Sequence, residues 1–168
     1  MKVSVSTIGI SELDVDLLLV PVTGEDLDEG LSTLVDAFGS VIEKARADMK
    51  SDGNSSVIYP DSGAAKRIVL LGVGDADSVT AERLRLAASD GASSASTVRA
   101  ETVGISVPSL ELDGDESSQA LVEGFILGSY RFDKYRTVEP EVDGTQRLVI
   151  QTDDQDKQVR RGADRGRI

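Results

Sequence analysis

Hydrophobic positions along the first part of the chain follow two periods, one typical of strands and one typical of helices. Residues 3 to 8 alternate between apolar and polar side chains, which predicts an outer strand. Val15–Val22 is nearly continuously apolar and predicts a buried central strand. From Asp26 to Ala47, apolar residues recur at spacings of three and four. This spacing predicts one helix, which Gly30 and Gly39 weaken without ending.

The rest of the chain continues the alternation of strands and helices. In chain order we predict strands at 57–59 and 68–73, a helix capped by Thr80, a strand at 103–107, a helix capped by Ser117 or Ser118, a strand at 148–150 and a helix start at about residue 155. This order is typical of helices packed on a mostly parallel sheet. We therefore expect an α/β fold of three layers, in which helices flank a mixed, mostly parallel sheet of about six strands.

Composition places the chain among single-domain globular proteins with an aliphatic core. The 168 residues suffice for one core, and the apolar residues include three Tyr, three Phe and no Trp. Without Cys, the chain has neither disulfides nor thiolate metal sites. It opens without a basic segment followed by a long apolar run, and it contains no apolar run of the ~20 residues that a bilayer span needs. We expect a cytoplasmic protein that does not enter a membrane.

The charge of the chain is strongly acidic. Thirty acidic and 18 basic residues give −12, spread as single acids that indicate a solvated surface. A second interpretation is adaptation to a salty cytoplasm, which predicts that the fold loses stability as salt is removed. Lys157–Ile168 departs from this trend, with five basic residues against Asp164. Such a segment can bind phosphate backbones, but the charge of the whole molecule argues against nucleic-acid binding, so we interpret it as a helix start.

Residues for catalysis are scarce in this sequence. His is absent, which excludes His-dependent nucleophile triads and zinc sites built from His. Three acidic clusters have the oxygen ligands that hard cations prefer: Glu25-Asp26-Asp28-Glu29, Asp113-Asp115-Glu116 and Asp153-Asp154-Asp156. Each cluster lies at a turn or helix start, where acids favour capping and the helix dipole. We assign no catalytic, cofactor-binding or metal-binding residue.

A glycine-rich turn follows the strand at 68–73. Gly72-Val73-Gly74 precedes a helix, as in dinucleotide-binding folds, where glycines let phosphates approach the backbone. The third glycine of that fingerprint is replaced by Asp77, and Asp75 and Asp77 would repel a pyrophosphate. We therefore interpret the segment as a simple strand-to-helix turn.

An aromatic segment follows the apolar helix that ends near Gly128. It reads Gly128-Ser129-Tyr130-Arg131-Phe132-Asp133-Lys134-Tyr135 and holds two of the three tyrosines. Aromatic rings next to a buried helix are expected to bury their apolar faces. We predict that Tyr130, Phe132 and Tyr135 pack the helix end against the sheet.

The same segment carries a family resemblance. Together with Ala120–Gly128 it closely resembles the helix and YRFDxY exit of the amino-terminal domains of M17 leucyl aminopeptidases, also called cytosol aminopeptidases. Lys66–Gly74 followed by Thr80–Arg85 resembles that family's strand, glycine turn and helix, and Asp14–Val22 resembles its opening strand. The resemblance extends over residues 1 to 168.

The resemblance implies a division of roles between two domains. Residues 1–154 would form a non-catalytic, macro-domain-like amino-terminal domain, and residues 155–168 would begin the helix that links it to a catalytic domain. In the family, that second domain holds two divalent metals, zinc or manganese, and an NTDAEGR-like motif with no match in this sequence. The implied parent is a homo-hexameric, cytoplasmic enzyme that releases amino-terminal residues such as leucine from peptides. This chain alone would be inactive.

Two alternatives come from other functional classes. Leu13–Val22 also resembles the second strand of macro domains, which favours a binder of ADP-ribose or another nucleotide. Macro domains have an Asn-rich loop after that strand, whereas this chain has Glu25 and Asp26, which would repel a diphosphate. The second alternative is a stand-alone acidic interaction domain.

Overall fold

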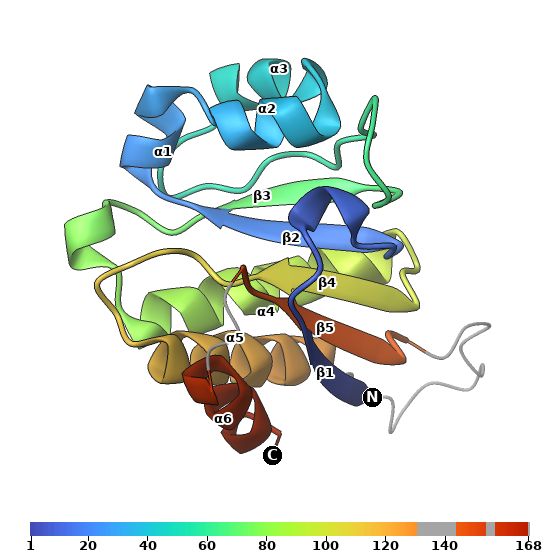
Figure 1. Ribbon diagram of the computed structural model, residues 1–168, viewed down its shortest axis with the longest axis vertical. Helices are drawn as coiled ribbons and strands as arrows, with labels where there is room; N and C mark the ends of the chain where they lie inside the picture. Colours follow the sequence, from blue (N-terminus) through green and yellow to red (C-terminus); the bar gives the residue numbers. More distant parts are fainter. Residues whose placement is uncertain (131–143, 154–156, 168) are drawn as a thin grey trace.

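A parallel sheet of five strands forms the centre of the molecule (Figure 1). The computed structural model describes residues 1–130, 144–153 and 157–167. The strands are β1 (Lys2–Ser6), β2 (Leu17–Val22), β3 (Ile68–Gly72), β4 (Thr102–Ser106) and β5 (Arg147–Gln151). Their order in the sheet is β1-β5-β4-β2-β3, and every neighbouring pair is parallel.

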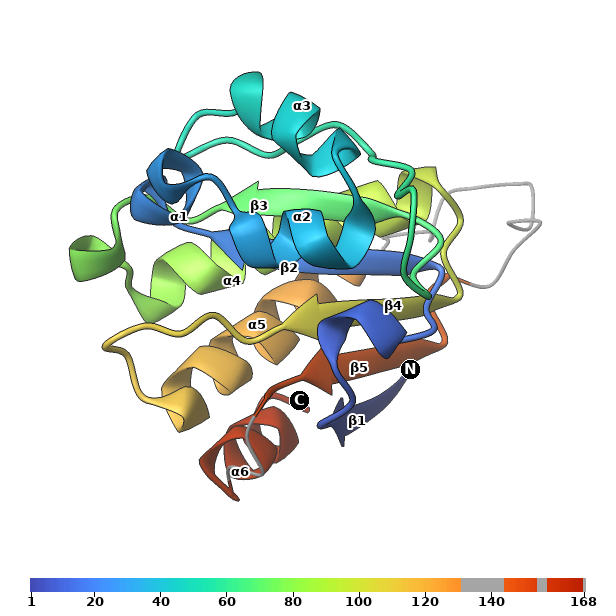
Figure 2. The ribbon, with the colours of Figure 1, turned by 45° about the horizontal axis from the view of Figure 1, so that its top comes forward.

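Helices cover both faces of this sheet (Figure 2). On one face lie α1 (Gly24–Glu29), α2 (Ser32–Phe38) and α3 (Val41–Ala47), and on the other α4 (Ala81–Thr97), α5 (Gly114–Ser129) and α6 (Lys157–Arg165). Two short 3-10 helices, η1 (Ile10–Glu12) and η2 (Ala76–Ser78), lie in the connections. The predicted three-layer α/β fold is confirmed. None of the helices described here is long and apolar enough to span a bilayer.

The two faces of β2 contribute to two separate hydrophobic cores. All six residues of β2 are buried, as expected for a central strand whose side chains alternate between two covered faces. Leu17 and Leu19 pack in the core beneath α4 and α5, with Phe125. Leu18 packs on the other side, with Phe38 of α2. The continuous apolar run therefore reflects burial on both sides.

The predicted strand at 57–59 does not become a sixth strand. Ile58 forms an isolated antiparallel bridge with Ile68, and Asn54 forms another with Leu71. The backbone groups of Ile58 and Ile68 exchange hydrogen bonds of 2.8 and 2.9 Å, and Pro60, which follows, has no N–H to extend a ladder. The described residues thus form five strands, and antiparallel pairing is limited to two bridges that cover the outer edge of β3.

The single helix predicted over Asp26–Ala47 is wrong, because the segment forms three short helices. Gly30 ends α1 with φ of 96°, and its N–H donates to the carbonyl of Asp26. Gly39 ends α2 with φ of 94°. A left-handed glycine after a helix is a common stop. The spacing of apolar residues persists across the breaks because all three helices face the same core.

Replacing Gly30 by alanine tests this stop without any packing change. A Cβ at Gly30 would have no atom within 4 Å, so the cost comes from the left-handed backbone alone. We expect a loss of about 1 kcal/mol in the free energy of unfolding. Gly9→Ala is the matched control, since Gly9 has φ of −53° and equally open space. Urea unfolding measures both, and equal midpoints would contradict the backbone explanation.

The caps of the long helices agree only partly with the prediction. Thr80 caps α4, and its hydroxyl accepts from the N–H of Arg83 at 3.2 Å, as predicted. The cap of α5 is Asp113 rather than Ser117 or Ser118, because its carboxylate accepts from the N–H of Asp115 at 3.2 Å. Asp is as good a cap as Ser, and both serines are buried inside the helix that it starts.

Helices α4 and α5 approach each other closely. A Cβ at Gly124 would collide with the carbonyl of Arg85, and a Cβ at Gly128 would lie 2.7 Å from the Cα of Ser89. Gly124 and Gly128 are four residues apart and therefore share one face of α5. The small residue Gly91 of α4 instead faces the sheet, because a Cβ there would lie 2.5 Å from the Cδ1 of Leu19. Small residues thus allow near backbone contact between these helices.

Candidate functional site

Several carboxylates of the acidic clusters serve as caps, loop contacts or ion-pair partners in the part of the chain that the structure describes. Among the described residues, no three Asp or Glu side chains converge as a metal site would require. Glu25 accepts from the N–H of Ala76 at 2.8 Å, and this hydrogen bond holds the pKa of Glu25 below its usual range. Asp26 and Thr23 form a reciprocal capping box at the start of α1. These carboxylates join loops and helix ends.

The cluster near the carboxyl end of β5 is only partly described. Asp153 accepts from the side-chain amide of Gln151 at 2.9 Å. Asp154 and Asp156 lie outside the described residues.

The glycine turn after β3 is filled by the chain itself. A Cβ at Gly72 would collide with the carbonyl of Gly53, so the loop before β3 lies directly against this backbone. Arg83 donates to the carbonyls of Asp52 and Gly72 at 2.7 and 3.0 Å and fixes the loop there. The approach to Gly72 is therefore occupied by backbone, and the N–H of Gly74 already donates to the carbonyl of Ser51 at 2.8 Å.

The aromatic exit of α5 differs from the prediction where the structure describes it. Tyr130 ends the helix with its side chain 75% exposed, so it does not pack against the sheet. Phe132 and Tyr135 lie outside the described residues.

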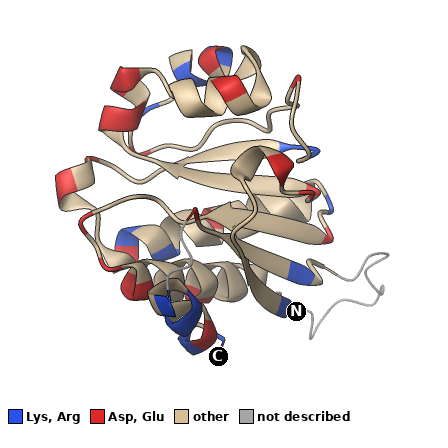
Figure 3. Cartoon of the chain, viewed as in Figure 1, with Lys and Arg blue, Asp and Glu red and all other residues tan. Residues whose placement is uncertain are grey.

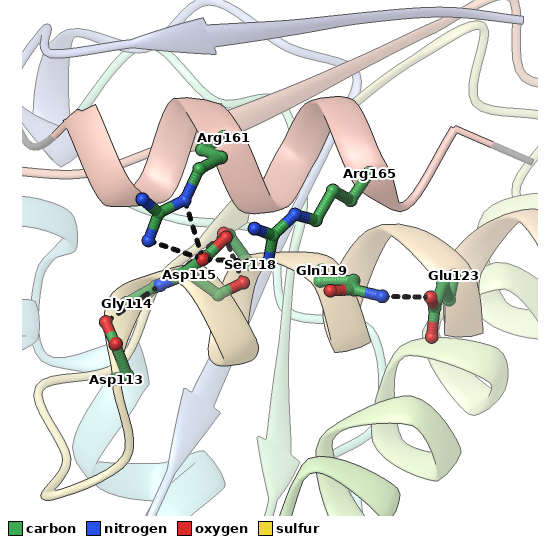
Figure 4. Close-up of polar contacts among 8 residues, drawn as sticks. All are labelled: Asp113, Gly114, Asp115, Ser118, Gln119, Glu123, Arg161 and Arg165. Atoms are coloured by element: carbon green, nitrogen blue, oxygen red, sulfur yellow. Dashed lines mark hydrogen bonds and ion pairs between the residues drawn. The ribbon is translucent and has the colours of Figure 1, made fainter.

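The most developed polar site lies where α6 packs on α5 (Figure 4). Asp115, in the first turn of α5, accepts hydrogen bonds from two arginines of α6 through the same oxygen, Oδ2. Arg161 approaches it with Nε at 2.8 Å and Nη2 at 2.6 Å, and Arg165 with Nη1 at 2.9 Å. The Asp115 side chain is 9% exposed, whereas both arginines are more than half exposed. One buried carboxylate is thus held between two partly hydrated guanidinium groups.

Glycines bring the two helices together at this point. A Cβ at Gly162 would collide with the carbonyl of Asp115 and the hydroxyl of Ser118. One turn later, a Cβ at Gly166 would lie 2.9 Å from the carbonyl of Gln119. Between them, Ala163 is fully buried. Because residues four apart share a face, α6 presents a small-residue surface that matches the first turns of α5.

The electrostatic environment of Asp115 has one favourable and one costly component. A carboxylate in the first turn of a helix interacts well with the helix dipole, and the arginines offset its charge. Its other oxygen, Oδ1, is buried and has no hydrogen-bond partner among the described residues, and the same holds for the hydroxyl of Ser117 nearby in α5. Buried groups of this kind cost free energy. The geometry therefore resembles a fixed docking contact between two helices.

A second, partly exposed junction ties the amino ends of three strands. Asp16, just before β2, accepts from the Nζ of Lys66 at 2.7 Å and from the N–H groups of Glu101 and Thr102 at 3.2 and 2.9 Å. The hydrogen bond from Lys66 lowers the pKa of Asp16, and the N–H of Thr102 adds to the effect. One carboxylate thus links the starts of β2, β3 and β4.

The lowered pKa of Asp16 predicts an acid-dependent contribution to stability. A carboxylate whose pKa is lower in the folded state stabilises the fold above its unfolded pKa, near 3.8, and loses this contribution as the pH falls through the folded value. We expect Asp16→Asn to lower the free energy of unfolding by about 1–2 kcal/mol at pH 7, and by clearly less near pH 2.5. Urea titrations at both pH values measure this, with exposed Asp14→Asn as control. An equal loss at both pH values would contradict it.

Comparison with known proteins identifies the family. The model of the N-terminal domain of the cytosol aminopeptidase family matches residues 22–139. The chain belongs to this family. The resemblance noted at residues 66–85 and 120–135 is therefore confirmed, and a nucleotide-binding macro-like module is not favoured.

Relatives of this cytosol aminopeptidase N-terminal domain are much longer proteins. A probable cytosol aminopeptidase of Chlorobium luteolum is 31% identical over 144 residues, which are 82% of this chain and 28% of that protein. One from a Synechococcus species is 29% identical over 143 residues, covering 84% and 29%. The chain thus spans less than a third of the length of these relatives.

Solved structures share the fold of this N-terminal domain. A mutant of tomato leucine aminopeptidase matches 98% of this chain and 35% of its own, with a TM-score of 0.79 and 18% identity. The bottromycin maturation enzyme BotP in complex with Mn matches 90% and 29%, with a TM-score of 0.58 and 20% identity. At these identities the likeness concerns the fold alone.

Sequence reasoning did not find the α5–α6 contact of the cytosol aminopeptidase N-terminal domain. It treated Asp115 as part of an acidic cluster and the basic segment as a helix start. Because 46 residues separate Asp115 from Arg161, no local pattern joins them. One usable signal was present: Gly162 and Gly166 share the spacing of Gly124 and Gly128. Such pairs indicate close helix contacts, but they do not name the partner helix.

Proposed function

We propose that this chain is the non-catalytic amino-terminal scaffold of a metal-dependent leucyl aminopeptidase, which releases amino-terminal residues such as leucine from peptides. The family match over residues 22–139 carries the proposal, together with the fact that the chain spans less than a third of its relatives' length. Those relatives are named probable cytosol aminopeptidases. In this proposal the catalytic residues belong to the remainder of such a protein.

The metal ions of the proposed enzyme would also belong to that remainder. Two divalent ions, zinc or manganese, would polarise the scissile carbonyl and activate water. The described residues of this chain do not fit such a centre, because no three acidic side chains converge and the buried Asp115 is already paired with arginines. The structure of BotP in complex with Mn is an example of a metal-bound protein with a related fold.

The proposed partners follow from the position of α6 and from charge. Residues 155–168 would lead into a catalytic domain, and the parent would assemble as a homo-hexamer in the cytoplasm, with peptides as substrates. The family's description as cytosol aminopeptidases supports this location. The distribution of charge is uneven, with acids over most elements and basic residues gathered on α6 (Figure 3). The net charge of −12 argues against nucleic acid as a partner.

Hydrolysis of leucine amide tests the proposal directly. We expect the purified 168-residue chain to be inactive with added manganese or zinc, and a longer natural product that contains it to be active and inhibited by a chelator. The intact mass of the natural product, detected with an antibody against this domain, is the second measurement. A species far heavier than 17.8 kDa supports the proposal. A species of that mass favours a stand-alone interaction domain, and chelator-sensitive activity of the chain alone would contradict the scaffold role.

A further inference from the structure

We infer that Asp115 is a positioning residue, which holds α6 in one register on α5 and thereby sets the direction in which the chain leaves this domain. The anchor is a property of the described residues themselves. Its consequence for a following catalytic domain rests on the proposed function.

The glycine contacts set how closely α6 approaches α5, but they do not hold it there. A slip by one turn, about 5 Å, in one direction would place Gln158 at the position of Gly162, where a Cβ would collide with the carbonyl of Asp115. A slip in the other direction would place Arg167 at the position of the buried Ala163. Steric fit therefore excludes these registers only while the two helices remain in close contact.

The ion pairs of Asp115 hold the two helices in that contact. Arg161 and Arg165 lie one turn apart and reach the same Oδ2 atom of Asp115 from both sides (Figure 4). A slip of one turn in either direction would take at least one guanidinium out of hydrogen-bond reach. Because Asp115 is buried, a lost arginine is not simply replaced by water at the carboxylate. The register with both arginines in place is thus the one that satisfies the buried charge.

A second contact lies just after α6. Arg167, two residues beyond Arg165, donates through Nη2 to the carbonyl of Val3 in β1 at 2.6 Å and also pairs with Asp164 at 3.3 Å. Asp115 thus holds the middle and the last residue of α6, and Val3, on a different element, holds the chain that follows it. The docking of α6 therefore determines the position of residue 167, and in the proposed longer protein it would set the direction of the chain that follows.

A spin-label distance between α4 and α6 tests the register. The chain has no Cys, so Ser93→Cys and Lys157→Cys, both at exposed positions, introduce the only labels. We expect one narrow distance distribution in this labelled chain and in its Glu116→Gln variant, which removes an exposed acid from the same helical turn. In Asp115→Asn we expect a broadened distribution, because α6 is no longer held in close contact with α5. An unchanged narrow distribution in Asp115→Asn would overturn the inference.

A double-mutant cycle separates direct anchoring from general destabilisation. Amide exchange in α6 should become roughly tenfold faster in Asp115→Asn, within the range for directly coupled pairs. Exchange should accelerate further in Arg161→Gln/Arg165→Gln, which leaves the buried carboxylate without its partners. Adding Asp115→Asn to that double variant should then slow exchange again, whereas adding it to exposed Arg160→Gln should not. Additive effects in both cases would overturn the inference.

The longer protein distinguishes failure of this inference from failure of the proposed function. The same label pair should give the same distance there, and a different distance would overturn the claim that α6 sets the exit of the chain. Lack of chelator-sensitive leucine aminopeptidase activity in the longer protein would instead contradict the proposed function, whatever the exchange and distance data show for α6.

Discussion

Replacing Gly124 by valine should destabilise the domain by about 3 kcal/mol, near the upper end of the usual range for overpacked cores. The Cβ alone would collide with the carbonyl of Arg85 and lie 2.7 Å from the Cα of that residue. Both are backbone atoms of α4, so no side-chain rotation relieves the clash. Helix propensity slightly favours valine over glycine, but by far less than this cost. The two helices must therefore move apart.

Urea unfolding of Gly124→Val measures this effect, with Gly9→Val as the matched control. Gly9 is exposed and has φ of −53°, and a Cβ added there would have no atom within 4 Å. We expect Gly9→Val to change the free energy of unfolding by less than about 0.5 kcal/mol. If Gly124→Val is as mild as the control, the contact between α4 and α5 is not the close backbone contact described above.

Phe125→Ala should have an effect of similar or larger size, about 3–5 kcal/mol. Phe125 neighbours Gly124 in α5 but faces the sheet, where it is fully buried in the core with Leu17 and Leu19. Truncation removes the ring and leaves a cavity that the strands cannot fill by shifting. Most of the stability of a domain of this size would be lost.

Leu127→Ala, on the same helix, is the control for Phe125→Ala. Leu127 is 60% exposed, so we expect a change of less than about 0.5 kcal/mol. Chemical denaturation at 25 °C compares the two variants. Equal losses would show that the cost arises from the helix itself, and they would contradict the packing explanation.

Much of the layered fold was predictable because buried strands and helices have recognisable patterns of apolar residues in the sequence. Leu17–Val22 is apolar throughout because both faces of β2 are covered, and Thr80 caps α4 through a local hydrogen bond. The breaks at Gly30 and Gly39 were not predicted. Both glycines end a helix because they adopt a positive φ. The sequence alone does not distinguish such a glycine from one that only weakens a helix.

The candidate site was less predictable, because its parts are distant in sequence. Asp115 and Arg165 are 50 residues apart, and only the folded packing of α5 and α6 brings them together. Local reasoning correctly placed an acid near a helix start, but it had no means to pair it. The exposure of Tyr130 was not predictable from its position either. A helix end can direct an aromatic side chain to solvent as readily as to the core.

Because β1 pairs with β5, β1 cannot join the sheet during synthesis until β5 has been made. Val3 pairs with Leu148, and β5 is the sole neighbour of β1 in the described sheet, because β1 lies at its edge. A ribosome adding about 5–20 residues per second needs roughly 7–30 s to make the intervening chain. During that time β2, β3 and β4 can already pair, while β1 has no partner in the sheet until β5 is made. We therefore expect β1 and β5 to join the sheet together, after β2, β3 and β4 have paired.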